Sequence, residues 1–323
     1  MRGRLERLVH VDEWNIGILP GVQAADLVAR PVWSIADVEW LFTPAPLESF
    51  ADPYFEMALD GSLRVWSERY SYLLSRGEIA CHHVRRGAPP VATRIPTEVV
   101  HRTGSFTPHV SYPLVVSDND GRRVGLMEMS QACRLDLFDV DPSGARWTYA
   151  ATLLEGVPVL DPTLLFHEDR WWMFCTIKGT GSYDALHLFH AEDIRGAWTA
   201  HPDNPVKVDL RSSRPGGHIF KVDGRMYRPA QDCSTVYGGA LTINRILALT
   251  PEVYQEELVT RLEPARSSAY PDGLHTLRVA DGVVMIDGRR RAFHALAATV
   301  KLVANYRQAA RLRRGHAMAA TES

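Results

Sequence analysis

The sequence predicts an all-β fold, a five-bladed β-propeller with a C-terminal helix. One pattern recurs five times along the 323 residues: a cluster with Pro or Gly, followed by two apolar runs that flank a turn. Four of the five turns contain Asp-Gly, which between alternating apolar runs is the strongest short signal for a β-hairpin. The repeats follow one another at intervals of about 50 to 60 residues, a spacing typical of four-stranded propeller blades.

Each repeat supplies the first two strands of a blade. These strand pairs are expected at 51–61 and 62–68, 111–116 and 124–128, 160–166 and 171–174, 215–220 and 226–231, and 274–279 and 283–287. Outer hairpins are expected at Asp136–Val140 in the second blade, ending before Trp147, and at Leu186–Ala191 in the third, ending before Trp198. An ordinary β-sandwich with coincidental Asp-Gly turns is the alternative. Polar residues at matching places in the repeats favour the propeller.

The repeats divide the chain into three parts. Residues 31–292 are expected to form the five-bladed propeller. Residues 1–30 are an N-terminal segment that closes it, with one strand near Asn15–Leu19. Residues 293–323 form a C-terminal helix and tail, because 294–313 contain neither Gly nor Pro.

The charge of the chain is nearly balanced, with 36 Lys and Arg residues against 38 Asp and Glu and a formal net charge of -2. This balance argues against a nucleic-acid partner, which demands a basic surface. The N-terminus lacks the apolar core of a signal peptide, and no stretch approaches the ~18 apolar residues that cross a bilayer. We therefore expect a cytoplasmic protein without a membrane span. The sequence leaves its oligomeric state open.

Motifs for cofactors and metals are missing from the sequence. It contains no GxxxxGK[ST] or GxGxxG run, no HExxH helix motif and no CxxC pair. We expect no cofactor and no metal. The four cysteines, Cys81, Cys133, Cys175 and Cys233, are far apart in the sequence and are expected as reduced core residues.

Polar residues gather where the predicted blades meet the central channel. The first strand of each blade lines that channel, so polar residues at the strand starts converge on one mouth. They are Asp52, Tyr112, Asp161, Arg214, His218 and His275. The second strands return toward the same mouth with Glu68, Glu128, Gln231 and Asp287, and Asp232 follows Gln231. The sequence therefore predicts a carboxylate-rich central site for a small, polyhydroxylated molecule.

Enzymes of glycosyl chemistry usually use a pair of carboxyl groups, of which one acts as base or nucleophile and the other as acid. We assign Asp52 as the base or nucleophile, Glu128 as the acid and Asp161 as a catalytic modulator. The expected substrate-binding residues are Tyr112, Arg214, His218, Gln231, Asp232 and His275. Two plainer interpretations stay open at this point. In the first, an Asp before Pro only caps a turn. In the second, Arg214 pairs with an Asp of the channel as a structural contact and does not bind substrate.

Several short stretches resemble a known family. Ala51-Asp52-Pro53 and Asp161-Pro162 at the starts of repeats resemble the five-bladed propellers of family-43-type glycoside hydrolases. The chain resembles more closely the N-terminal propeller domain of glucosamine inositolphosphorylceramide transferases and its bacterial relatives. The resembling stretches are 14–17, 111–113, 171–174, 198–202, 204–206, 214–217, 228–233 and 274–276, within about residues 14–290.

The resemblance implies roles for some of these residues. The hydrolases use an Asp of blade one as base, an Asp as pKa modulator and a Glu as acid. Asp52 matches the base by motif. Asp161 matches the Asp-Pro type in the third repeat rather than the second, and Glu128 lies in the second repeat, outside the hydrolases' usual acid motif. The plant transferases carry a separate glycosyltransferase domain, so the resemblance does not bring transferase activity with it.

These observations lead to one functional hypothesis and two alternatives. We expect a carbohydrate-active enzyme that performs glycosyl transfer or hydrolysis on a small glycoside, through acid and base carboxylates. The first alternative is a non-glycosidic biosynthetic enzyme that uses the same acids for a cyclisation or elimination. The second is a module that binds a sugar or lipid headgroup without catalysis, which needs no acid with a raised pKa.

Overall fold

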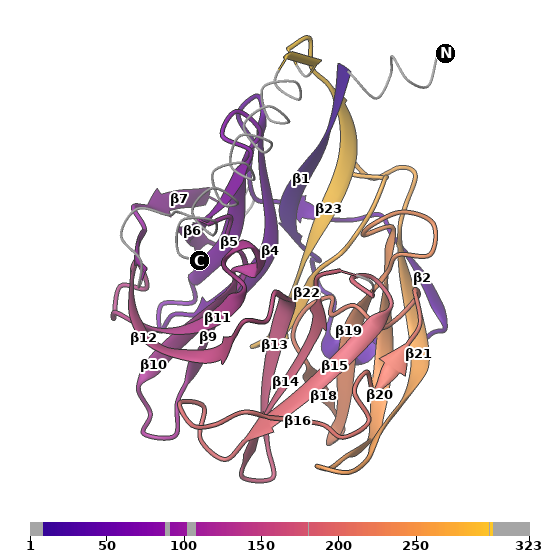
Figure 1. Ribbon diagram of the computed structural model, residues 1–323. Helices are drawn as coiled ribbons and strands as arrows, with labels where there is room; N and C mark the ends of the chain where they lie inside the picture. The colour runs from indigo at the N-terminus through magenta and orange to yellow at the C-terminus, as the bar shows by residue number, and fades with distance from the viewer. Residues whose placement is uncertain (1–8, 88–90, 102–107, 180, 297, 300–323) are drawn as a thin grey trace.

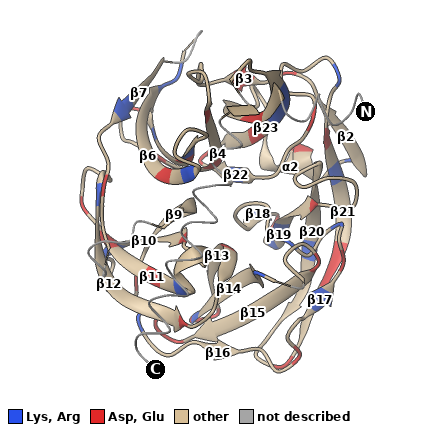
Figure 2. Cartoon of the chain, turned by 45° about the horizontal axis from the view of Figure 1, so that its top comes forward, with Lys and Arg blue, Asp and Glu red and all other residues tan. Residues whose placement is uncertain are grey.

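Five sheets surround a central axis in the computed structural model, which describes residues 9–87, 91–101, 108–179, 181–296 and 298–299 (Figure 1). Each sheet is one blade, and the predicted five-bladed β-propeller is confirmed. The first strands of the blades lie nearest the centre of the ring, and the last strands lie at its rim (Figure 2).

The first three blades follow the order of the chain. Blade one contains β4 (Glu48–Met57), β5 (Leu63–Ser71), β6 (Arg76–Arg85) and β7 (Val91–Ile95). Blade two contains β9 (Ser111–Ser117), β10 (Arg123–Glu128), β11 (Arg134–Val140) and β12 (Arg146–Glu155), with β8 (Glu98–Val100) at its edge and the 3-10 turn η1 (Ser130–Ala132) after β10. Blade three contains β13 (Val159–His167), β14 (Arg170–Ile177), β15 (Ala185–Ala191), β16 (Thr199–Ala200) and β17 (Lys207–Val208).

The last two blades combine strands from the C-terminal part of the propeller with strands from the first 40 residues. Blade four contains β18 (Phe220–Val222), β19 (Arg225–Asp232), β20 (Ala240–Leu249) and β21 (Tyr254–Pro264), with β2 (Val32–Ile35) parallel to β21. Blade five contains β22 (Leu277–Ala280), β23 (Val283–Phe293), β1 (His10–Ile18) and β3 (Glu39–Trp40). The short helix α2 (Ala24–Leu27) joins β1 to β2.

The ring is closed by its N-terminal strands. β1 pairs with β23 from His10 opposite Phe293 to Ile18 opposite Met285, so the two distant ends of the propeller share one sheet. β2 then pairs in blade four, and β3 pairs in blade five. The strands that close the ring therefore extend beyond residue 30. Blade five thus contains strands from both ends of the propeller, and the pairing of β1 with β23 keeps the ring closed.

The hairpins follow from their turn residues. Asp223-Gly224 and Asp281-Gly282 have positive φ at both positions, as a type I′ turn requires. Glu168 and Asp169 also have positive φ, at 51° and 55°, although the third repeat has no glycine there. The type I′ turn matches the twist of the paired strands, which explains its recurrence between first and second strands.

The core lies between neighbouring blades. Trp66 and Trp147 are completely buried, and both indole N–H groups donate to the carbonyl of Gly144, at 2.7 and 3.1 Å. The Trp171 indole donates to Asn119 Oδ1 at 2.6 Å and joins blade three to blade two. Large aromatic side chains with a satisfied N–H fill the wedge between twisted sheets.

The predicted helix and tail at 293–323 lie almost entirely outside the described residues. Among the helices that the structure describes, none has the length and apolar character to traverse a bilayer.

Candidate active site

Three of the five first strands are broken at the same place. Asp52, Tyr112 and Asp161 have φ values of 55°, 48° and 49°. Each residue precedes a proline, and each pair opposes a single residue of the second strand, which makes a β-bulge. A left-handed φ is costly for a residue with a Cβ, and such strain concentrates at functional sites. The bulges at these X-Pro motifs therefore change the direction of the side chains before proline. These residues are not simple turn caps.

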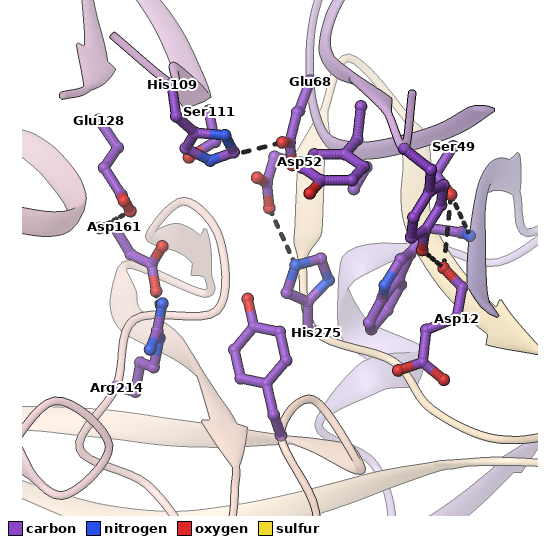
Figure 3. A pocket seen from close by; sticks show the side chains of 15 residues that line it. Asp12, Ser49, Asp52, Glu68, His109, Ser111, Glu128, Asp161, Arg214 and His275 are labelled. Atoms are coloured by element: carbon purple, nitrogen blue, oxygen red, sulfur yellow. Dashed lines mark hydrogen bonds and ion pairs between the residues drawn. The ribbon is translucent and has the colours of Figure 1, made fainter. Parts of the chain in front are cut away.

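These bulges surround one cavity of about 370 Å³ (Figure 3). Five carboxylates and four aromatic rings share its wall. Its lining residues are Asp12, Trp14, Ser49, Ala51, Asp52, Glu68, Tyr70, Tyr72, His109, Ser111, Glu128, Asp161, Arg214, Tyr237 and His275. The cavity thus combines hydrogen-bonding groups with flat apolar faces in one small space.

Asp52 is held by groups from blades two and five. Its Oδ2 accepts the Tyr112 backbone N–H at 3.2 Å, and its Oδ1 accepts the Thr276 hydroxyl at 2.8 Å. His275 Nε2 lies 3.3 Å from Asp52 Oδ1, and His275 Nδ1 lies 2.6 Å from Asp287 Oδ2. The imidazole therefore lies between two buried carboxylates and fixes the position of Asp52.

The ionisation of this group follows from burial and charge. Burial raises the pKa of Asp52 to about 6, although the neighbouring His275 lowers it. Burial lowers the pKa of His275, but the negative charges of Asp287 and Asp52 outweigh that effect and leave the pKa above its usual value. At pH 7 Asp52 is therefore mostly ionised, and the two carboxylates favour the cationic form of the imidazole beside it.

Glu128 and Asp161 form a second group on another wall of the cavity (Figure 3). Glu128 Oε2 accepts the Asp161 backbone N–H at 3.2 Å, and its Oε1 accepts the Ser130 hydroxyl at 3.1 Å. Asp161 Oδ2 accepts the Arg214 Nε–H at 2.6 Å and the Gln231 amide at 2.9 Å. Asp161 is thus paired with a cation, whereas Glu128 accepts no hydrogen bond from a cation among the described residues.

Glu128 is a weaker acid than Asp52. Burial raises its pKa to about 8, and repulsion by Asp161 adds to that effect against the attraction of Arg214. At pH 7 Glu128 keeps its proton, whereas Asp52 does not. Two carboxyl groups with separated pKa values in one cavity are the arrangement expected of an acid and base pair.

One trio of side chains has the composition of a metal site. Ligand atoms of Asp52, His275 and Asp287 lie within 4.8 Å of one another, so they could hold a divalent cation. In this geometry the imidazole binds both carboxylates, and a protonated histidine cannot ligate a metal. The ion pair and a metal therefore exclude each other, and the absence of a metal stays a prediction.

Five of the nine residues predicted for the site line the cavity: Asp52, Glu128, Asp161, Arg214 and His275. The structure brings these five together from blades one to five, with Arg214 and His275 in the segments that precede β18 and β22. The convergence of polar residues at the strand starts was therefore predictable from the repeat alone.

The other four predicted residues, Tyr112, His218, Gln231 and Asp232, are absent from the cavity's lining. The Tyr112 hydroxyl contacts Thr163 Oγ1 at 2.8 Å and accepts the Gly217 N–H at 2.8 Å. The His218 ring packs on Tyr54 and Tyr112, with centroids at 4.8 and 6.0 Å. Gln231 holds Asp161, and Asp232 pairs with Arg261 at 2.9 Å. These side chains contact protein groups and support the wall.

Sequence reasoning missed most aromatic residues of the cavity. Tyr70 lies two residues after Glu68 in β5, and Tyr72 comes two residues later, directly after the strand ends at Ser71, so the alternation of a strand was the signal that placed all three on one face. Trp14 stacks on His275 with ring centroids at 4.1 Å, and Tyr237 comes from the loop after β19. His109 precedes β9, and no pattern in the sequence singles it out.

Solved structures share the fold of this chain. The exo-β-1,3-galactanase 1,3Gal43A from Clostridium thermocellum has a TM-score of 0.52 and 15% identity, over 69% of this chain and 53% of that chain. A family 117 glycoside hydrolase, Zg3597, from Zobellia galactanivorans has a TM-score of 0.51 and 11% identity, over 86% of this chain and 90% of that chain. At such identities the similarity concerns the fold.

Curated relatives are more similar in sequence. Glucosamine inositolphosphorylceramide transferase 1 from Arabidopsis thaliana is 27% identical over 275 residues, which are 78% of this chain and 35% of that protein. The protein of the same name from Oryza sativa subsp. japonica is 30% identical over 153 residues, which are 46% of this chain and 20% of that protein. This chain therefore corresponds to about a third or less of each relative's length.

The repeats, the bulged strand starts and the central cavity occupy one continuous part of the chain. A family model described as "Glucosamine inositolphosphorylceramide transferase 1, N-terminal" matches residues 11–271, from β1 to the segment before β22. The chain belongs to this family.

Proposed function

We propose that this protein is a carbohydrate-active enzyme that transfers or hydrolyses the glycosyl group of a small glycoside in the central cavity. One observation carries the proposal. Asp52 and Glu128 line the same cavity, and their surroundings leave one ionised and the other protonated near pH 7. The names of the relatives and of the solved structures with this fold support a carbohydrate ligand.

Glu128 acts as the general acid in this proposal. It gives its proton to the glycosidic oxygen while the bond from that oxygen to the anomeric carbon breaks. Its pKa of about 8 keeps the proton available at neutral pH. The charge of Asp161 raises that pKa, so Asp161 is the modulator of the acid.

Asp52 acts on the anomeric carbon or on its acceptor. As a base it takes the proton of a water or hydroxyl that attacks this carbon, and as a nucleophile it forms the bond itself. The His275 cation favours the ionised form of Asp52 that either role requires. The aromatic rings of Trp14, Tyr70 and Tyr237 offer faces on which a sugar ring stacks.

The test is a pair of isosteric substitutions assayed on a panel of p-nitrophenyl glycosides and nucleotide sugars. Asp52→Asn and Glu128→Gln are each expected to lower turnover by about 10²-fold or more, the contribution of acid and base groups. Asp120→Asn and Glu98→Gln are matched controls at exposed positions, with side chains 66% and 63% exposed, and should retain wild-type activity.

Three results would contradict the proposal. Normal turnover in Asp52→Asn would remove the assigned base. Binding of a panel sugar without turnover at any pH would indicate a binding module. Neither binding nor turnover of any sugar by the wild-type protein would leave the non-glycosidic enzyme as the better hypothesis.

A further inference from the structure

Glu68 is a carboxyl group of the cavity that the proposed chemistry leaves without a role. It lies on β5 opposite Ala51, the position that Glu128 occupies on β10 opposite Ser111. Among the described residues its buried Oε1 atom has no hydrogen-bond partner of good geometry. The Oε1 atom faces His109 within the wall, which leaves Oε2 as the oxygen through which a bound molecule would complete the hydrogen bonds of this carboxyl group.

His109 orients this carboxyl group. The His109 Nδ1 atom accepts the backbone N–H of Gly77 at 2.8 Å, so Nδ1 carries no proton. The ring hydrogen is therefore on Nε2, which faces Glu68 Oε1 at 3.5 Å (Figure 3). Burial lowers the pKa of His109 to about 4, so the ring is neutral at pH 7 and supplies no cation to Glu68.

Gly77 provides the room for this pair. A Cβ at position 77 would lie 2.2 Å from Glu68 Oε1 and 2.8 Å from the His109 ring. Any side chain larger than hydrogen would displace the carboxyl or the imidazole. The hairpin of β5 and β6 therefore accommodates Glu68 and His109 together.

The charges around Glu68 decide which of its forms is present. Burial first, and then repulsion by Asp52 and Glu128, raise its pKa well above the usual value. With no cation beside it among the described residues, the buried Glu68 carboxyl favours its neutral, protonated form. Because Oε1 faces the N–H of His109, the hydroxyl hydrogen belongs on Oε2, the other oxygen.

We propose that Glu68, oriented by His109, is a specificity-determining group that donates a hydrogen bond from Oε2 to an oxygen of the bound glycoside beside Asp52. This inference rests on the proposed function and adds a substrate requirement to it. An ionised carboxylate accepts hydrogen bonds from sugar hydroxyls, whereas this group donates. The glycoside must therefore present an acceptor there, such as a ring oxygen or an acyl carbonyl.

The first experiment needs no substrate. Infrared difference spectra at pH 7 compare the wild-type protein with Glu68→Gln and with the exposed control Glu98→Gln. The carbonyl stretch of a protonated carboxylic acid is expected in the wild type and in Glu98→Gln, and its intensity should drop in Glu68→Gln. Equal intensity in all three proteins would overturn the proposal.

The second experiment measures binding of the p-nitrophenyl glycoside that the wild type holds most tightly. Glu68→Ala is expected to raise Kd about tenfold, the effect of one hydrogen bond. Glu68→Gln keeps an N–H donor in place of the Oε2 hydroxyl, so its loss should be about threefold or less. His109→Asn keeps the acceptor for Gly77 without the donor to Glu68 and should weaken binding, and His109→Gln should restore part of it.

The outcomes separate this inference from the proposed function. If the wild type binds and turns over a glycoside but Glu68→Ala binds it equally well, only the role of Glu68 fails. If Glu68→Gln loses turnover as completely as Glu128→Gln while Kd is unchanged, Glu68 transfers a proton and the donor role is wrong. If no glycoside binds the wild type, the proposed function fails and the inference fails with it.

Discussion

Arg214 Nε donates to Asp161 Oδ2 across 2.6 Å and joins blade four to blade three at the wall of the cavity. Both side chains are more than nine-tenths buried, with 8% and 5% exposed. Loss of one partner leaves the other charge buried without compensation, which costs more than the pair itself contributes. The pair therefore holds blades three and four together, and its two charges act on the pKa of Glu128 in opposite directions: Asp161 raises it and Arg214 lowers it.

Asp161→Ala is expected to lower the free energy of unfolding by about 3–5 kcal/mol. The substitution leaves the Arg214 guanidinium buried without its carboxylate. Urea unfolding followed by tryptophan fluorescence measures the change, with the exposed Asp120→Ala as the control. A loss below about 1 kcal/mol would show that water replaces the carboxylate at little cost.

The pH dependence of kcat/KM is expected to be bell-shaped. Asp52 must be ionised, so activity should rise with pH near 6. Glu128 must be protonated, so activity should fall as the pH passes about 8. A profile that is flat between pH 5 and 9 would contradict the assignment of both residues.

His275→Gln is expected to move the acidic limb of that profile to higher pH by about 1–2 units. The His275 cation lowers the pKa of Asp52, so its removal lets burial raise that pKa further. The basic limb, set by Glu128, should move less. An acidic limb that stays in place would show that His275 carries no charge in the free enzyme.

Glu128→Gln is expected to stabilise the protein at alkaline pH while it lowers the activity. The pKa of Glu128 is about 8 in the folded protein against a usual value of 4.5, so only the unfolded chain loses the proton between these values. Wild-type stability therefore falls through this window, and the glutamine variant does not share that loss. The difference should be on the order of 5 kcal/mol at pH 8.5 and vanish at pH 4. Chemical unfolding at the two pH values measures it.

Gly217→Ala is expected to destabilise the propeller by more than about 3 kcal/mol. Gly217 has a φ of 124°, and a Cβ there would lie 1.9 Å from the carbonyl oxygen of Leu277. Gly217 forms a parallel bridge to Leu277, so the substitution separates blade four from blade five. Gly224→Ala, in an open turn with no atom within 4 Å, is the control for backbone strain alone. Equal unfolding midpoints for both variants would contradict the steric argument.

The repeat made much of the site predictable. Asp52, Asp161 and His275 were placed by their position at the start of a blade, and Glu128 by its distance from the preceding turn. The propeller geometry brings such positions to one mouth of the central channel, independently of the conformation of the loops. Tyr237 and His109 were not predictable, because loops and strand ends follow no period from which a side chain's direction can be read.

Some assignments depended on contacts that a sequence does not contain. Gln231 and Tyr112 occur at the expected places, yet their side chains bind Asp161 and Gly217 rather than lining the cavity. Glu68 and Glu128 are equivalent by register, and only their neighbours distinguish them. His109 lies against Glu68, whereas the backbone N–H of Asp161 lies against Glu128.

The sequence by itself determined the five-bladed propeller, because turn residues and alternating apolar runs are local and repeat at a regular interval. It also determined that carboxylates would meet at the channel, because topology carries equivalent positions to one place. Only the tertiary structure decided which carboxyl groups keep a proton. That property depends on burial and on charges contributed by other blades, such as His275 beside Asp52 and Asp161 beside Glu128.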